Sequence, residues 1–314
     1  MFLAAPLAVD ARPIRKARIG YLSGNPPPDT EKAVEAFRAK LRDLGYVDGP
    51  NLLIEYRYAD GKYERLPQLA ADLVRLKVDV IFTFGTPAAR AAKNATSTIP
   101  IVFGVVSDPL AAGLVTSLTR PGGNATGVTP NNPELSAKRV SLLKEAVSTA
   151  ARMSVLANPD FAATPHMLAE TRRGAQVLGL ELQILEAREP LQLARAFAAM
   201  TKSNTNGVIV LADPMFIAQR RAIVDLALSH RVPAIYHLRD FVEVGGLISY
   251  GADYLEMFQQ SAVLVDKILK GAKPSDLPVE QPWHYSLVIN LKTAKMLGLA
   301  IPASLLLQAS QVIE

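Results

Sequence analysis

Four polar residues that directly precede a proline carry most of the recognisable chemistry of this sequence. Each follows a short apolar, β-like run, and the four pairs are Thr86-Pro87, Asp108-Pro109, Asn158-Pro159 and Asp213-Pro214. A small polar residue before proline is typical of a helix start, because its side chain caps free backbone N–H groups and proline has no N–H to lose. The pattern predicts four helices that begin at the ends of four buried strands.

Helix starts at the carboxyl ends of parallel strands form the ligand crevice of an open α/β sheet. Their free N–H groups and partial positive charge favour a negatively charged group on the ligand. At any single site an ordinary βα cap is the alternative, since such caps are common. The even division of the four pairs between two halves of the chain favours a shared crevice.

The polar groups around these helix starts suit a small zwitterion. Thr86 and Ser107 are expected to donate their hydroxyls to a carboxylate, and Asp213 is expected to pair with an ammonium. Asp108 is interpreted mainly as the cap of its own helix. Asn158 is expected to reach the crevice from the second half of the chain.

Several aromatic residues lie at or near predicted strand ends: Tyr21, Phe216, Tyr236 and Tyr250. They either enclose an apolar or aromatic part of the ligand or pack beside their strands. His237 follows a strand and is expected to line the crevice, whereas the histidines as a group show no metal-ligand spacing. The sequence contains no glycine-rich phosphate motif and no Gly-x-Ser-x-Gly elbow, so it predicts no cofactor, metal or catalytic residue.

Composition narrows the possible classes of protein. The chain has 314 residues, of which 49% are hydrophobic and 20% charged, and this suggests about two globular domains. The absence of cysteine excludes disulfides and thiolate chemistry. The net charge of +5 is scattered without a basic stripe, so no nucleic-acid partner is predicted, and no apolar run is long enough to span a membrane.

Strands and helices are predicted to alternate twice along the chain. In the first half, strands at 18–22, 51–58, 80–84 and 101–105 alternate with helices at 29–44, 66–76, 87–94 and 110–118. In the second half, helices at 134–149, 162–178, 191–201 and 216–229 alternate with strands at 152–157, 180–185, 207–211 and 232–236. Helical crossovers of this kind join parallel strands, so the restart predicts two α/β lobes of one architecture.

Several long stretches resemble one protein family. They include Ser107-Asp108-Pro109, residues 112–115, the run Arg120-Pro121-Gly122-Gly123-Asn124-Ala125-Thr126-Gly127-Val128, residues 245–251, residues 267–274 and residues 289–295. The family comprises substrate-binding proteins of ABC importers and includes the tryptophan-binding lipoprotein of Gram-positive bacteria. The resemblance extends over nearly the whole chain from about residue 18.

The resemblance implies a type I periplasmic binding protein fold, with two doubly wound parallel-sheet lobes joined by three hinge strands. The expected N-terminal lobe is 18–128 plus 251–281, and the expected C-terminal lobe is 129–250 plus 282–314. Residues 1–17 are expected to be a signal remnant or an extension. By family analogy, the ligand lies against loops at Ser23, Gly85-Thr86, Ser107-Asp108, Asn158 and Asp213.

The resulting expectation is a binding protein that closes on a small carboxylate-bearing ligand, either an amino acid, with aromatic amino acids among the candidates, or an aromatic carboxylate. Closure is expected at 129–132, near 250–253 and near 282–285. A permease and an ATPase are the implied partners. The lack of a cysteine near the start departs from the lipoprotein relatives and favours a soluble periplasmic protein. The alternatives are an α/β enzyme and a ligand-sensing regulator that use the same cleft.

Overall fold

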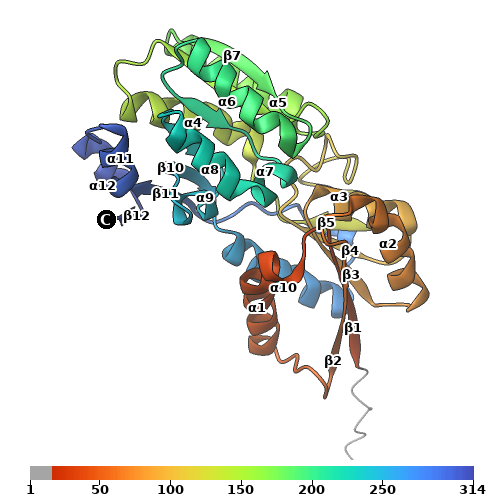
Figure 1. Cartoon of the computed structure of the whole chain (residues 1–314). Helices are drawn as coiled ribbons and strands as arrows, with labels where there is room; N and C mark the ends of the chain where they lie inside the picture. Colours follow the sequence, from red (N-terminus) through yellow and green to blue (C-terminus); the bar gives the residue numbers. More distant parts are fainter. Residues whose placement is uncertain (1–15) are drawn as a thin grey trace, which may run out of the picture.

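Two separate β-sheets form the framework of the computed structural model, which describes residues 16–314 (Figure 1). The first sheet has five parallel strands in the order β2-β1-β3-β4-β5. The second has seven strands in the order β12-β11-β10-β9-β8-β6-β7, and β10 with β11 is its antiparallel pair. The prediction of two α/β lobes is confirmed. Most of the expected signal remnant lies outside the described residues.

The N-terminal lobe is the five-stranded sheet with the helices that cover it. Its strands are β1 (Ala17–Ser23), β2 (Leu52–Tyr58), β3 (Val80–Phe84), β4 (Ile101–Gly104) and β5 (Ala125–Gly127). Its helices are α1 (Pro27–Asp43), α2 (Leu66–Arg75), α3 (Thr86–Ala95) and α10 (Tyr254–Leu269). Although α10 follows β10 of the second sheet in the chain, it packs beside α1 on this lobe (Figure 1).

The strands of this lobe are apolar because both faces of the sheet are covered. Along β1, Ile19 and Tyr21 pack into the core under α1 and α10, whereas Leu22 packs into the core under α2 and α3. Successive side chains of a strand point to opposite faces, so a strand between two helical layers must be apolar on both sides. This burial explains why β3 could be located from sequence to the residue.

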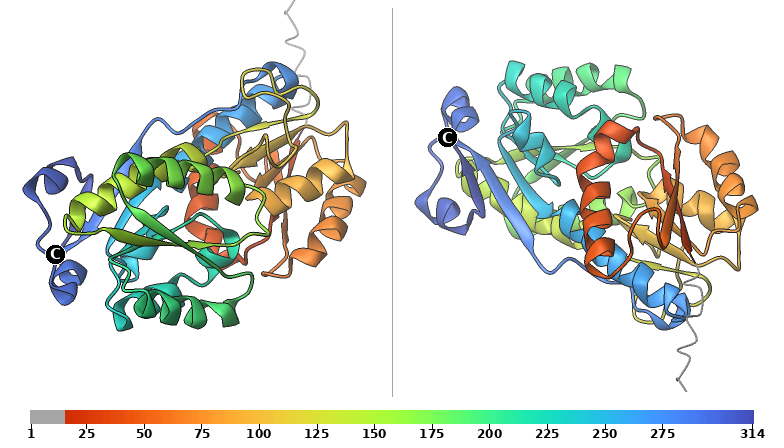
Figure 2. Two further views of the ribbon diagram at one scale, coloured as in Figure 1. Left: turned by 90° about the horizontal axis from the view of Figure 1, so that it is seen from above. Right: turned by 90° about the horizontal axis from the view of Figure 1, so that it is seen from below.

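The C-terminal lobe is the seven-stranded sheet with its helices (Figure 2). Its strands are β6 (Arg152–Ala157), β7 (Glu181–Glu186), β8 (Val208–Val210), β9 (Ala234–Tyr236), β10 (Ile248–Ala252), β11 (Tyr285–Asn290) and β12 (Gln311–Ile313). Its helices are α4 (Asn132–Ala146), α5 (Thr164–Val177), α6 (Leu193–Lys202), α7 (Pro214–Ala218), α8 (Arg220–Ser229), α9 (Asp240–Glu243), α11 (Leu291–Leu297) and α12 (Ala303–Gln308). None of the described helices has the length and apolarity of a membrane span.

The chain passes between the lobes three times. It leaves the first sheet after β5, returns after β10 to form α10, and leaves again before β11. Three connections, near one edge of each sheet, therefore join the two lobes. The carboxyl ends of the other strands face the space between the lobes, where the sequence placed the crevice.

The predicted helix at 110–118 is wrong. After β4 the chain forms turns, and Asp108 Oδ1 accepts hydrogen bonds from the N–H groups of Leu110 and Ala111 at 3.1 and 3.0 Å. Gly113, at φ 69°, then turns the backbone out of the helical conformation. Asp108 thus caps a single turn in place of a helix.

Two other helix starts also differ from the prediction. Asn158 Oδ1 accepts from the N–H of Asp160 at 3.1 Å in a local turn, and the helix begins only at Thr164. The predicted helix at 216–229 is instead two helices, α7 and α8, which meet at Gln219. Asx-type turns and true N-caps use the same residues, so their sequence signatures coincide.

Candidate functional site

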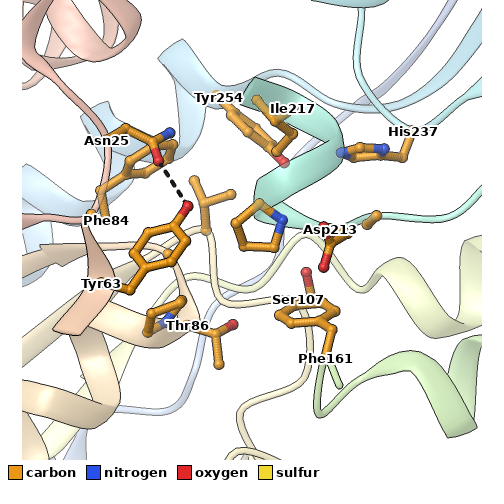
Figure 3. A pocket seen from close by; sticks show the side chains of 16 residues that line it. Asn25, Tyr63, Phe84, Thr86, Ser107, Phe161, Asp213, Ile217, His237 and Tyr254 are labelled. Atoms are coloured by element: carbon orange, nitrogen blue, oxygen red, sulfur yellow. Dashed lines mark hydrogen bonds between the residues drawn. The ribbon is translucent and has the colours of Figure 1, made fainter. Parts of the chain in front are cut away.

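A pocket lies between the lobes, at the carboxyl ends of strands from both sheets (Figure 3). The pocket and its mouth hold about 480 Å³ of empty space. The N-terminal lobe, including α10, contributes Gly24, Asn25, Tyr63, Phe84, Gly85, Thr86, Pro87, Val105, Ser107 and Tyr254. The C-terminal lobe contributes Phe161, Ala212, Asp213, Pro214, Ile217 and His237.

The structure brings five of the predicted site residues together in this pocket. They are Gly85, Thr86, Ser107, Asp213 and His237. Each directly follows a strand, or lies within a few residues of its end, so parallel strand order alone places them at one edge of their sheet. The two lobes then present these edges to each other.

Thr86 opens α3 but does not cap it. The residue before the helix is Gly85, at φ 82°, and its position makes the predicted cap wrong by one residue. None of the described residues forms a hydrogen bond with the Thr86 hydroxyl, which lies at the pocket beside the first turn of α3 (Figure 3). The free N–H groups of that turn add partial positive charge to this wall of the pocket.

Asp213 is the carboxylate of the pocket, and it is 3% exposed. It caps α7 as predicted: its Oδ1 accepts from the N–H groups of Met215 and Phe216 at 2.8 and 3.1 Å. Asn158 Nδ2 donates to Oδ2 at 3.0 Å. Burial raises the pKa of Asp213 to about 6, while these three hydrogen bonds act in the opposite direction.

His237 is 1% exposed, and neither of its ring nitrogens has a hydrogen-bond partner. Burial lowers its pKa to about 3, and the positive charge of Arg139 acts in the same direction. The imidazole is therefore neutral near pH 7, with one N–H donor and one acceptor nitrogen to offer. A buried polar group without a partner is costly, so a ligand that supplies one gains affinity there.

Five other predicted residues do not line this pocket. Ser23 bonds to the backbone of Asn25, and Asp108 contacts His166 on the other lobe. Asn158 lies one layer behind the pocket, where it holds Asp213. Tyr236 and Tyr250 also lie outside the pocket lining.

The two tyrosines predicted near the ligand belong to the C-terminal lobe. Tyr236 is fully buried and stacks on Phe241 with ring centroids 4.6 Å apart. Tyr250 packs against the core of that lobe, 6.3 Å from the ring of Tyr285. The sequence shows that a residue ends a strand, but not which sheet face its side chain takes.

Most of the aromatic wall was missed by sequence reasoning. Tyr63, Phe84, Phe161 and Tyr254 all line the pocket (Figure 3). Phe84 ends β3 directly before Gly85, and this position was a usable signal. Tyr63 begins a short 3-10 helix, Phe161 lies in a loop, and Tyr254 begins a helix of the returning chain, so only the tertiary fold places them.

The pocket has few charged groups. Among its described lining residues, Asp213 is the acid, and lysine and arginine are absent. Within residues 16–314, no cluster of His, Asp and Glu has the arrangement of a metal site. A ligand must therefore bind through hydroxyls, backbone N–H groups, one carboxylate and aromatic surface.

The family model described as ABC transporter substrate binding protein matches residues 27–313. The chain belongs to this family. Its fold is that of type I periplasmic binding proteins. The family consists of solute-binding proteins that act outside the cytoplasm.

Three relatives illustrate the similarity. The Tyrosine-binding protein of Clostridioides difficile (strain R20291) is 28% identical over 273 residues, which is 87% of this chain and 78% of that protein. A conserved domain protein of Vibrio cholerae has a TM-score of 0.89 and 29% identity, covering 95% of this chain and all of the other. The ABC domain of Streptococcus pneumonia in complex with L-Trp has a TM-score of 0.89 and 28% identity, with the same coverage.

Proposed function

We propose that this protein is the periplasmic solute-binding component of an ABC importer and captures an amino acid, specifically an aromatic one. The family match supports the transport role, with a permease and an ATPase as its partners. The relatives described as binding tyrosine or L-Trp support the ligand class. The composition of the pocket supports the same ligand class independently.

This proposal rests on one observation: one wall of the pocket offers hydrogen-bond donors and the opposite wall offers a carboxylate. Thr86 and Ser107 present hydroxyls from the N-terminal lobe, and Asp213 presents a carboxylate from the C-terminal lobe. An amino acid has a carboxylate for the first wall and an ammonium for the second. In a desolvated pocket, both charge-assisted contacts are stronger than in water.

The remaining wall suits an aromatic side chain. Phe84, Tyr254 and Phe161 line the pocket together with Tyr63, and these rings offer edge and face contacts to a bound ring. Phe84 itself lies 6.2 Å from Tyr254, edge to face, so this part of the wall is already packed.

Closure of the lobes is part of the proposal. Asp108 Oδ2 lies 3.0 Å from His166 Nδ1, and Asn132 Nδ2 donates to Ser107 Oγ at 3.2 Å, so both contacts join the N-terminal lobe to the C-terminal lobe. We propose hinges at 129–132, near 250–253 and near 282–285. The corresponding lobes are 18–128 plus 251–281 and 129–250 plus 282–314.

A thermal-shift screen over amino acids and simple aromatic carboxylates tests the ligand class. A ligand at 100 times its Kd adds roughly 2.7 kcal/mol to the free energy of unfolding. We expect L-tyrosine or L-tryptophan to shift the melting temperature and Asp213→Ala to remove most of that shift. Shifts from aromatic carboxylates alone would contradict the role of Asp213, and no shift from any amino acid would contradict the ligand class.

A further inference from the structure

Arg139 of α4 is fully buried, yet none of the described acidic residues lies within ion-pair distance of it. Its Nε donates to the carbonyl of Tyr250 at 2.8 Å, and its Nη2 donates to Asn132 Oδ1 at 2.9 Å. Burial lowers its pKa to about 10, so the guanidinium is still charged at neutral pH. A buried charge without a counter-charge is costly, and Arg139 does not line the pocket itself but is connected to it through Asn132 and Ser107.

Arg139 fixes the orientation of the Asn132 side chain. A guanidinium has only donors, so the amide oxygen of Asn132 must face it and the amide NH₂ must point away. That NH₂ donates to Ser107 Oγ at 3.2 Å, and both side chains are buried. Ser107 is therefore an acceptor towards Asn132, and its own proton remains available for another acceptor.

The proton of Ser107 is available on the pocket side. Ser107 lines the pocket, and its hydroxyl points towards the pocket centre in Figure 3. Among the described residues, Asn132 is its hydrogen-bond partner, and the lining offers no lysine or arginine to a carboxylate. Three donors thus follow one another in a single direction, from Arg139 through Asn132 to Ser107.

We propose that Arg139 and Asn132 are positioning residues. They orient and polarise the Ser107 hydroxyl so that it donates a hydrogen bond to the ligand carboxylate. This inference rests on the proposed function and adds the source of its selectivity for a carboxylate. Hydrogen bonds aligned in one direction polarise one another, so the Ser107 O–H becomes a stronger donor than an isolated hydroxyl.

The chain of donors also links selectivity to lobe closure. Ser107 follows β4 of the N-terminal lobe, whereas Asn132 and Arg139 belong to α4 of the C-terminal lobe. The Asn132–Ser107 hydrogen bond joins the two lobes in this structure, and we expect opening of the lobes to weaken it. A ligand without a carboxylate therefore gains less from closure than an amino acid does.

The test compares the affinities of L-tyrosine and L-tryptophan with those of L-tyrosinamide and L-tryptophanamide by isothermal titration calorimetry. In the natural protein we expect the carboxylate form to bind roughly 10- to 100-fold more tightly, the range for a hydrogen bond to a charged group. Asn132→Asp places a carboxylate beside Arg139 and removes the donor to Ser107. Ser107→Ala removes the last donor. Both changes are expected to reduce this ratio severalfold, and the remainder comes from Thr86 and the first turn of α3, which also face the carboxylate.

Two matched variants control for charge and for loss of a hydroxyl. Asn206→Asp adds the same charge at the amino end of β8, where its Oδ1 still accepts from the N–H groups of Ala151 and Arg152. Ser261→Ala removes a buried hydroxyl that donates to a carbonyl within α10. Both are expected to keep the ratio of the natural protein.

The outcomes separate this inference from the proposed function. If the natural protein prefers the carboxylate forms and Ser107→Ala and Asn132→Asp keep that preference, the donor chain is wrong and the proposed function stands. If the natural protein binds none of the four compounds, the proposed function fails and the inference falls with it. If Asn132→Asp does not fold, the ratio for Asn132→Ala, which removes the same donor to Ser107 without adding a charge, decides the matter.

Discussion

The carboxylate of Asp213 is buried, accepts three hydrogen bonds and has a pKa raised to about 6. A ligand ammonium favours the ionised form, so the pKa of Asp213 is lower in the complex than in the free protein. We therefore expect affinity for L-tyrosine to fall as pH decreases below about 6, by at most about tenfold per pH unit. Calorimetric titrations across this range measure the effect.

The matched variant for this prediction is Asp213→Asn. It keeps an oxygen that can accept from Met215 and Phe216 but carries no charge, so we expect weak binding without the pH dependence. An identical pH profile in the variant would assign the titration to another group. His237 does not interfere, because burial keeps its pKa near 3 and its ring neutral throughout.

His237 is a residue at which ligand binding and stability are opposed. Replacing it with leucine removes two buried, unpartnered nitrogens, so we expect the ligand-free protein to gain roughly 1–3 kcal/mol of unfolding free energy. The affinity for a ligand that hydrogen-bonds the ring is expected to fall. Chemical denaturation and titration calorimetry measure the two effects, and loss of both stability and affinity would indicate a packing role.

The pKa of His237 also fixes the sign of a pH effect on stability. Its folded-state pKa is about 3, below its ordinary value of 6.5, so the unfolded chain binds the proton more readily. This group costs stability progressively as pH falls from about 6.5 towards 3. The stability advantage of His237→Leu is therefore expected to grow as pH decreases over that range.

Among the elements, α10 is a helix of the N-terminal lobe that begins directly after a strand of the C-terminal lobe, and a side chain caps its start. Asp253 accepts from the N–H of Leu255 at 2.8 Å and caps α10. We expect Asp253→Ala to lower the unfolding free energy by about 1 kcal/mol, with Asp253→Asn close to the natural protein. Equal stability of the two variants in urea denaturation would show that tertiary packing alone fixes the start of α10.

The elements that sequence predicted best are the buried parallel strands. Residues 80–84 and 152–157 match β3 and β6 to the residue, because a strand covered on both faces is a short apolar run with polar ends. The prediction of a helix at 110–118 failed although the apolar spacing there fits a helix. The turn capped by Asp108 and the positive φ of Gly113 keep this stretch in turns. The helix α12 and the strand β12, which follow Gly298, were not predicted.

The site was predictable to the extent that strand order fixes it. Thr86, Ser107 and Asp213 could be assigned because polar residues after parallel strands converge at one sheet edge. Tyr236 could not be placed, because strand position does not reveal which core a ring enters. Arg139 could not be found at all, since a basic residue on a helix normally indicates an exposed face.

At the scale of the whole molecule, one of the polar contacts between the lobes is partly exposed. The Asp108–His166 pair joins them, with side-chain exposures of 9% and 54%. Asp108→Asn keeps the oxygen that accepts from Leu110 and removes the charge. We expect a small loss of closure, of about 0.2–1 kcal/mol, which appears as at most about fivefold weaker ligand binding.

Lobe closure itself predicts a change in molecular dimensions. We expect the radius of gyration from small-angle X-ray scattering to be larger without ligand and to decrease when L-tyrosine or L-tryptophan saturates the protein. Asp108→Asn is expected to retain this change with a slightly higher ligand requirement. A radius of gyration that stays constant through saturation would argue for a rigid pair of lobes.

The crystal structure of the protein with the amino acid that gives the largest thermal shift tests the central claim most directly. The account predicts one ligand between the lobes, with its carboxylate on Thr86 and Ser107 and its ammonium on Asp213. Electron density for that amino acid outside this pocket, or with its charged groups reversed, would contradict the account.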